Sequence, residues 1–123
     1  YSPPSFETFD ELIAFARELR EQNPAAPEIS EAGLNRYGYD LLGEGEYDRA
    51  ITILTLNTEF YPESANCWDS LAEAYLIRGD KERAIELYRK ALETLDAHPK
   101  ENARYEGLRR SIPERLKELG EIE

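Results

Sequence analysis

The stretch that decides the fold reads SANCWDSLAEAYLIRGDKERAIELYRKALETLDAH and runs from residue 64 to residue 98. Its apolar residues recur every three or four positions on both sides of Gly79-Asp80, which is the spacing of two amphipathic helices. Glycine suits the left-handed position that ends a helix, and aspartate suits the N-cap of the next one. Ser64 is expected to cap the first of the two helices. The stretch therefore predicts a helix–turn–helix unit.

The same layout recurs 34 residues upstream. The positions that coincide include a leucine, the turn glycine, an arginine and an alanine–isoleucine pair: Leu42 and Leu76, Gly45 and Gly79, Arg49 and Arg83, Ala50-Ile51 and Ala84-Ile85. They cluster at the turn and at the small-residue helix contact that follows it, which is typical of a repeat protein. We therefore expect two repeat units, residues 30–63 and residues 64–98.

Helices are also expected on both sides of these units. Residues 8–11 have the capping-box pattern that starts a helix and Pro24 ends it, so residues 1–29 should form a Pro-rich linker and an N-terminal helix. Residues 99–123 should form a C-terminal capping helix, in which Pro113 must produce a kink or start a new segment. No strand-like alternation is present, and the expected fold class is all-α, one domain of helices in antiparallel pairs.

Small and large residues alternate at fixed positions of both helices in each unit, and glycine marks the turns: Gly38, Gly45, Ala50, Pro62, Trp68, Leu71, Ala72, Tyr75, Gly79, Ala84, Tyr88 and Ala91. This signature resembles the tetratricopeptide repeat family. The resemblance implies a right-handed α-α superhelix (TPR-like), in which small residues let helices approach and large ones fill the remaining space. It also implies that Trp68 is largely buried and is not a stacking platform for bases.

Three further strings are similar to a particular group of repeat tails. They are FETFDEL at residues 6–12, LNRYGYDLL at residues 34–42 and YPESAN at residues 61–66. Such tails occur at the C-terminus of some bacterial serine hydrolases of the α/β-hydrolase esterase and β-lactamase-related types. The resemblance implies a hydrolase domain upstream. The chain begins with Tyr1 and lacks a starting methionine, so we interpret it as a domain of a longer protein.

The net charge of the chain excludes some classes of binding partner. The net charge is −11, from 26 acidic and 15 basic residues. Phosphate backbones and anionic lipid surfaces repel such a chain, so neither nucleic acid nor a membrane is expected as partner. The acidic, lysine-poor composition is also typical of proteins that live in high salt. Cys67 is the only cysteine, which leaves the compartment open; a cytoplasmic location follows only if the chain is a whole functional unit.

Residues for catalysis or metal binding are sparse. The sequence holds no Gly-x-Ser-x-Gly motif, and His98 is its only histidine, so no catalytic residue is expected. One cysteine and one histidine cannot make a zinc site, and no metal or cofactor is expected. Cys67 is interpreted as a small core thiol. Asp69 and Glu73 lie one helical turn apart and are interpreted as helix charges rather than as a metal site or a catalytic acid pair.

The resemblance places one candidate binding surface on the first helix of each unit, made by Asn35, Tyr39, Leu42, Asp69, Glu73 and Leu76. The first hypothesis is therefore a non-catalytic scaffold for protein–protein interaction. In one alternative, the surface packs on an upstream domain of the same chain or on a second copy, as a weak homo-oligomer. In another, the domain is an accessory, lid or stability element of an upstream serine hydrolase.

Overall fold

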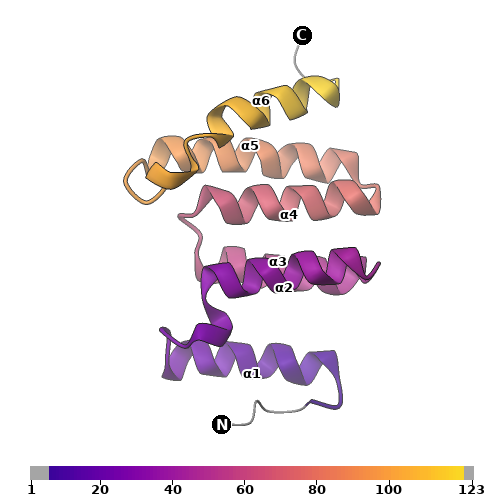
Figure 1. Ribbon diagram of the computed structural model, residues 1–123, viewed down its shortest axis with the longest axis vertical. Helices are drawn as coiled ribbons and strands as arrows, with labels where there is room; N and C mark the ends of the chain where they lie inside the picture. Colours follow the sequence, from indigo (N-terminus) through magenta and orange to yellow (C-terminus); the bar gives the residue numbers. More distant parts are fainter. Residues whose placement is uncertain (1–5, 121–123) are drawn as a thin grey trace.

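The computed structural model describes residues 6–120, and all regular elements in this range are helices (Figure 1). In chain order they are α1 (Phe9–Gln22), η1 (Pro27–Ile29), α2 (Glu31–Gly43), α3 (Tyr47–Phe60), α4 (Ala65–Arg78), α5 (Lys81–Ala97), η2 (Ala103–Tyr105) and α6 (Leu108–Glu118). The prediction of an all-α fold is confirmed. The start of the Pro-rich linker, residues 1–5, and the end of the predicted capping helix, residues 121–123, lie outside the described residues.

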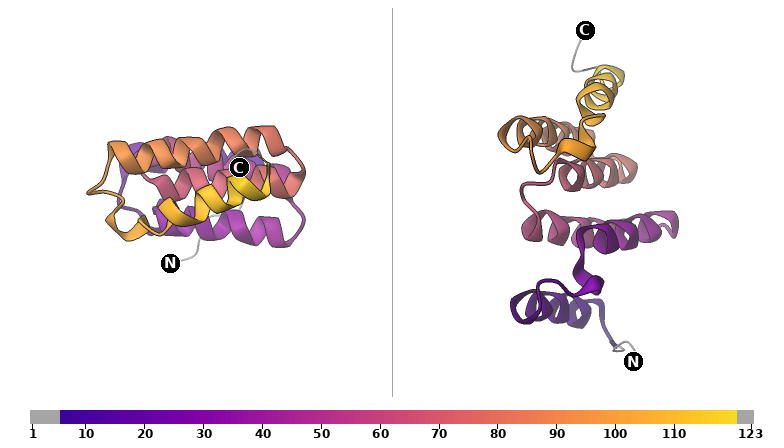
Figure 2. Two further views of the ribbon diagram at one scale, coloured as in Figure 1. Left: turned by 90° about the horizontal axis from the view of Figure 1, so that it is seen from above. Right: turned by 60° about the vertical axis from the view of Figure 1, so that its left-hand side comes forward.

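Two helical hairpins are stacked on one another. α2 packs along α3 and α4 packs along α5, while α3 also contacts α4. α1 lies beyond the first hairpin, and α6 lies against α5 at the other end of the stack (Figures 1 and 2). The four helices therefore form one continuous array. The first helices of the two hairpins are α2 and α4, and the second helices are α3 and α5.

Both hairpin turns use a glycine with left-handed backbone. The φ angle is 79° at Gly45 and 105° at Gly79, values that side chains with a Cβ rarely adopt. Directly after Gly79, the N–H of Asp80 donates to the carbonyl of Tyr75 at 2.9 Å. This bond satisfies a carbonyl that the end of α4 would otherwise leave open, and the turn before α3 uses the same pattern.

The helix caps agree with the sequence in part. The hydroxyls of Thr8 and Ser30 each accept the N–H three residues further on, at 3.2 and 3.0 Å, and so cap α1 and α2. The expected cap by Asp80 is wrong, because its side chain makes no bond to the start of α5. The carboxylate accepts instead from the Nε of Arg78 at 3.0 Å.

Ser64 is not the side-chain cap of α4, contrary to the sequence prediction. Its buried hydroxyl has no hydrogen-bond partner among the described residues. The amide oxygen of Asn102 takes this place and accepts from the N–H of Ala65 at 2.7 Å, while the Asn102 amide nitrogen donates to the carbonyls of Glu63 and His98, each at 2.8 Å. Asn102 is 1% exposed, so one buried side chain joins the start of α4 to the end of α5.

The chain after α5 differs from the sequence prediction for the same reason. The sequence predicts a capping helix over residues 99–123, but α6 begins only at Leu108. The connection between α5 and α6 contains η2 and is held inward by Asn102. Pro113 then lies inside α6 and does not start a new segment.

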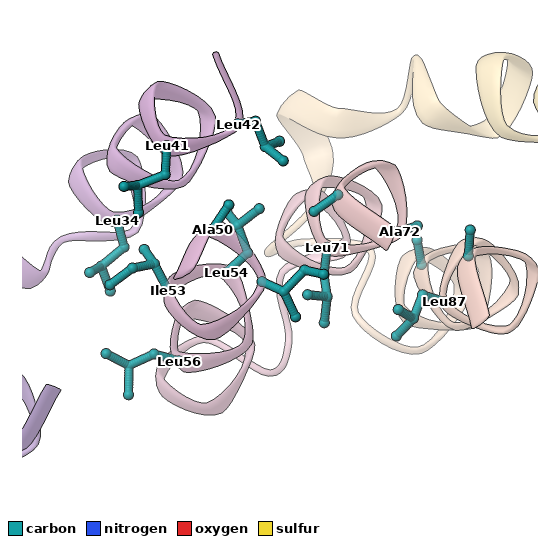
Figure 3. Packing of buried hydrophobic residues seen from close by; sticks show 14 of the residues in the cluster. Leu34, Leu41, Leu42, Ala50, Ile53, Leu54, Leu56, Leu71, Ala72 and Leu87 are labelled. Atoms are coloured by element: carbon teal, nitrogen blue, oxygen red, sulfur yellow. The ribbon is translucent and has the colours of Figure 1, made fainter. Parts of the chain in front are cut away.

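Small residues set the spacing of the helices (Figure 3). A Cβ added at Gly38 would lie 2.5 Å from the side chain of Leu54, so α2 and α3 are in backbone-to-side-chain contact at this point. The alanines at the other close contacts have no exposed surface: Ala50, Ala72, Ala84 and Ala91. Leucine and isoleucine side chains fill the space around them, which makes one continuous apolar core.

Trp68 has intermediate burial and packs against the apolar core. Its indole N–H donates to the carbonyl of Pro62 at 3.0 Å, and the ammonium group of Lys90 lies 5.6 Å from the ring centroid. The ring therefore contacts both the apolar core and a flexible cation of α5. The buried position beside it belongs to Cys67, which is 1% exposed.

Replacement of Asn102 with alanine should lower the free energy of unfolding by about 2–3 kcal/mol, because buried backbone groups would lose their partner. The matched control is Ser64→Ala, which removes a hydroxyl that bonds nothing among residues 6–120 and should change stability by less than about 0.5 kcal/mol. Chemical denaturation followed by circular dichroism measures both. Equal effects of the two substitutions would contradict the assigned cap.

Candidate functional site

The first helices of the two hairpins share an outward side, here called the A face. It is defined by Asn35 and Tyr39 on α2 and by Asp69 and Glu73 on α4. In each helix the two residues lie four positions apart and so project from the same side, one turn above the other. All four side chains are half-buried.

A hydrogen bond joins the two helices across the A face. The hydroxyl of Tyr39 donates to Oε2 of Glu73 at 2.6 Å. Burial, together with this bond, raises the pKa of Tyr39 well above its usual range, so the phenol stays protonated and remains a donor. The contact fixes the Glu73 carboxylate in position at the surface of α4.

Asp69 lies one turn before Glu73, and the charged form of its carboxyl group is destabilised. Its pKa is raised to about 6, mainly by burial and also by the charge of Glu73, while Arg115 on α6 lowers it in part. Arg115 also faces the hydroxyl of Tyr88, whose pKa burial raises to about 12. The A face therefore carries two neighbouring carboxylates of which one is partly desolvated.

The apolar candidates of the A face divide into two kinds. Leu42 is 8% exposed and points from α2 toward α4, so it belongs to the core and offers a ligand almost no surface (Figure 3). Leu76 is half-buried. Ile77, one turn beyond Glu73, is 46% exposed, and the sequence analysis missed it. The four-residue spacing from Asp69 through Glu73 to Ile77 was the signal that could have identified it.

One end of the A face is a polar pocket of about 450 Å³, here called the η2 pocket. It lies between the first turns of α2 and α4 and the segment that contains η2, and it is lined by Glu31, Ala32, Asn35, Arg36, Asn66, Glu101, Arg104 and Tyr105. The hydroxyl of Tyr105 donates to Oε2 of Glu31 at 2.8 Å and closes the pocket. Of the lining residues only Asn35 was predicted. Glu31, Ala32 and Arg36 lie on the same helix, whereas the remaining walls come from distant parts of the chain.

The two side chains considered for catalysis, Cys67 and His98, lie in surroundings that fit a structural role. Burial raises the pKa of the Cys67 thiol to about 12, so at neutral pH it is not a thiolate. His98 follows the last turn of α5, where its N–H donates to the carbonyl of Thr94 at 2.9 Å. No group of three or more histidine, cysteine, aspartate or glutamate side chains within residues 6–120 is arranged to hold a metal ion.

Residues 65–97, which comprise α4 and α5, match the family model for the tetratricopeptide repeat. The chain contains a tetratricopeptide repeat. In this repeat α4 is helix A and α5 is helix B, and the all-helical stack is that of a helical-repeat superhelix. The small signature residues of the repeat, Ala72, Ala84 and Ala91, are all fully buried.

Curated relatives share a stretch about twice as long as one repeat. Over 58 residues, or 47% of this chain, the sequence is 38% identical to Superkiller complex protein 3 of Mus musculus and of Homo sapiens. The match spans 4% of the length of each relative. The similarity is therefore to a repeat segment of a much larger protein.

The described part of the chain has no helix that is both long enough and apolar enough to cross a membrane.

The raised pKa of Asp69 gives a pH-dependent test of the repeat's A face. A carboxyl group with a pKa near 6 in the folded state and about 4 in the unfolded chain binds protons more tightly when folded, so it destabilises the fold as pH rises from about 4 to 6. Asp69→Asn should therefore raise the free energy of unfolding by about 1–2 kcal/mol at pH 7 and have little effect below about pH 4.

Urea unfolding at a series of pH values measures this difference. Asp40→Asn, on the exposed part of α2, is the matched control and should leave the pH profile unchanged. A loss of stability at pH 7 in Asp69→Asn would contradict the assigned environment.

Proposed function

We propose that this chain is a non-catalytic interaction domain whose A face binds a segment of a protein partner. The observation that carries the proposal is the carboxylate pair of Asp69 and Glu73. Two neighbouring negative charges, one of them partly desolvated, destabilise the free domain and contribute nothing to its core. A cation from a partner would relieve both the repulsion and the lost hydration.

The partner segment should be basic and partly apolar. Asp69 and Glu73 would bind a lysine or arginine side chain, and Tyr39 keeps the Glu73 carboxylate in place for it. Leu76 and the exposed Ile77 lie beyond the acid pair on the same helix and would contact an apolar neighbour of that cation. The net charge of −11 favours fast association with a basic partner.

The comparisons support the general class of this function. Tetratricopeptide repeats mediate protein–protein interactions, and residues 65–97 form one. The matching relatives are named as proteins of a superkiller complex. We infer from the class alone that the partner is a protein.

A second candidate has the A face, or the domain as a whole, packed on a hydrolase domain of the same chain. The strings at residues 6–12, 34–42 and 61–66 support this accessory role through their similarity to bacterial serine hydrolase tails. In either case the isolated domain should hydrolyse neither esters nor β-lactams, since no nucleophile with an adjacent base is present among residues 6–120.

Basic peptides should bind the domain more tightly than acidic peptides of the same length and apolar content. Double substitution Asp69→Asn and Glu73→Gln should weaken binding of the basic set about tenfold, or by roughly 1.4 kcal/mol, because it removes both acceptor charges. Added salt should weaken binding to the unsubstituted domain. Fluorescence anisotropy at low and high salt measures all three effects.

The control variant is Glu18→Gln with Glu21→Gln on α1, which removes the same charge from an exposed surface away from the A face. Analytical ultracentrifugation of the same samples determines whether the domain self-associates. Equal binding of basic and acidic peptides, unchanged by the A-face substitutions, would exclude this function and leave packing within its own chain as the better account.

A further inference from the structure

The η2 pocket contains a buried hydrogen-bond acceptor without a partner and two arginines without an ion pair. The Oδ1 atom of Asn35 is buried and has no partner in the described chain. Arg36 and Arg104 are exposed and form no ion pair with any carboxylate of residues 6–120. Both arginines line the same pocket, so their guanidinium groups can face one ligand there.

The pocket's own acids leave these arginines available. Glu31 accepts the hydroxyl of Tyr105 at 2.8 Å, so a neutral donor occupies part of its carboxylate. Glu101 is exposed to solvent and forms no ion pair with a described cation. Arg104 lies 5.7 Å from the ring centroid of Tyr105, which holds its guanidinium beside the pocket wall.

The A face has both arginines and glutamates at its pocket end and two carboxylates further along α4. Asn66 lines the η2 pocket, and Asp69, Glu73 and Ile77 follow it on α4 at spacings of three or four residues. The rise of an α-helix puts Glu73 about 10 Å beyond Asn66 along the axis. An extended chain covers about 10 Å in three residues. A ligand lying along the helix would thus meet arginines first, then two carboxylates, then an apolar surface.

We propose that the η2 pocket binds the carboxylate side chain of an extended peptide segment whose basic residue, about three positions away, reaches Asp69 and Glu73. This proposal rests on the proposed function and specifies its partner. Guanidinium groups bind carboxylates with paired, charge-assisted hydrogen bonds, a role that suits Arg36 and Arg104. The Asn35 side-chain amide supplies both a donor and an acceptor, which match the two polar groups of a peptide unit.

A carboxylate on a side chain fits this arrangement better than the end of a chain. The main chain of the ligand then continues along the A face past Asn35 and brings its cation to Glu73. The segment recognised is therefore bipolar: an acidic residue, two spacer residues, a basic residue and an apolar residue.

Four peptides with acetylated and amidated ends test the proposal by fluorescence anisotropy. The first has the bipolar order, the second replaces its acidic residue with the amide, the third replaces its basic residue with glutamine, and the fourth places acid and base next to each other. A fifth peptide lacks the acidic side chain and ends in a free carboxylate. The bipolar peptide should bind about tenfold more tightly than each of the others.

Arg36→Gln with Arg104→Gln should abolish the advantage of the bipolar peptide over the second peptide and leave the affinity for the second peptide unchanged. Arg110→Gln is the matched control, because Arg110 is an exposed arginine on α6 outside the η2 pocket. Thermal unfolding by circular dichroism verifies that each variant is folded.

Equal affinity of the bipolar and second peptides would overturn the inference while leaving the basic-segment function in place. An arginine-dependent advantage for the fifth peptide alone would also overturn it, in favour of a chain end. If none of the peptides binds in a manner that depends on Asp69 and Glu73, the proposed function fails as well, so the two failures are distinguishable.

Discussion

Leu54 lies so close to the backbone of α2 that a Cβ on Gly38 would fall 2.5 Å from its side chain. This contact lets the first hairpin close, and the fully buried Ala72 has the place of Gly38 in the second. The binding surface depends on the same packing. Gly38 and Ala72 face the core. Tyr39 and Glu73 follow them about 100° further round each helix, and one hydrogen bond joins their side chains.

The A face combines that rigid support with unfavourable electrostatics. Packing against two helices makes Asp69 partly desolvated, and Glu73 adds a like charge one turn away. Arg115 on α6 compensates only in part, because its nearest carboxylate is Glu118, at 3.6 Å. The well-packed core of small residues beneath the site offsets the unfavourable free energy of its two neighbouring carboxylates. A cationic ligand can relieve this unfavourable free energy.

Asn102 links the repeat architecture to the η2 pocket. Its side chain forms hydrogen bonds with the start of α4 and the end of α5. These bonds hold the connection before α6 against the ends of both helices. Tyr105 then reaches Glu31 at the start of α2 and closes the space between the hairpins. One buried amide thus satisfies two helix termini and also creates a polar wall that the two hairpins alone would lack.

The sequence by itself determined the helices from α1 to α5, the turns of the two hairpins and the pairing within them. These features depend on interactions between residues within about four positions of one another, so the sequence shows both partners. They are the apolar spacing, the turn glycines Gly45 and Gly79, and the caps at Thr8 and Ser30.

Tertiary structure alone decided the surroundings of the site. It buried Leu42, left Trp68 partly exposed and gave the cap of α4 to Asn102 rather than to Ser64. It also brought Tyr105 to Glu31 across a sequence separation of 74 residues. These outcomes depend on contacts between residues far apart in the sequence. Hydrophobic periodicity describes only neighbouring positions and therefore cannot predict them.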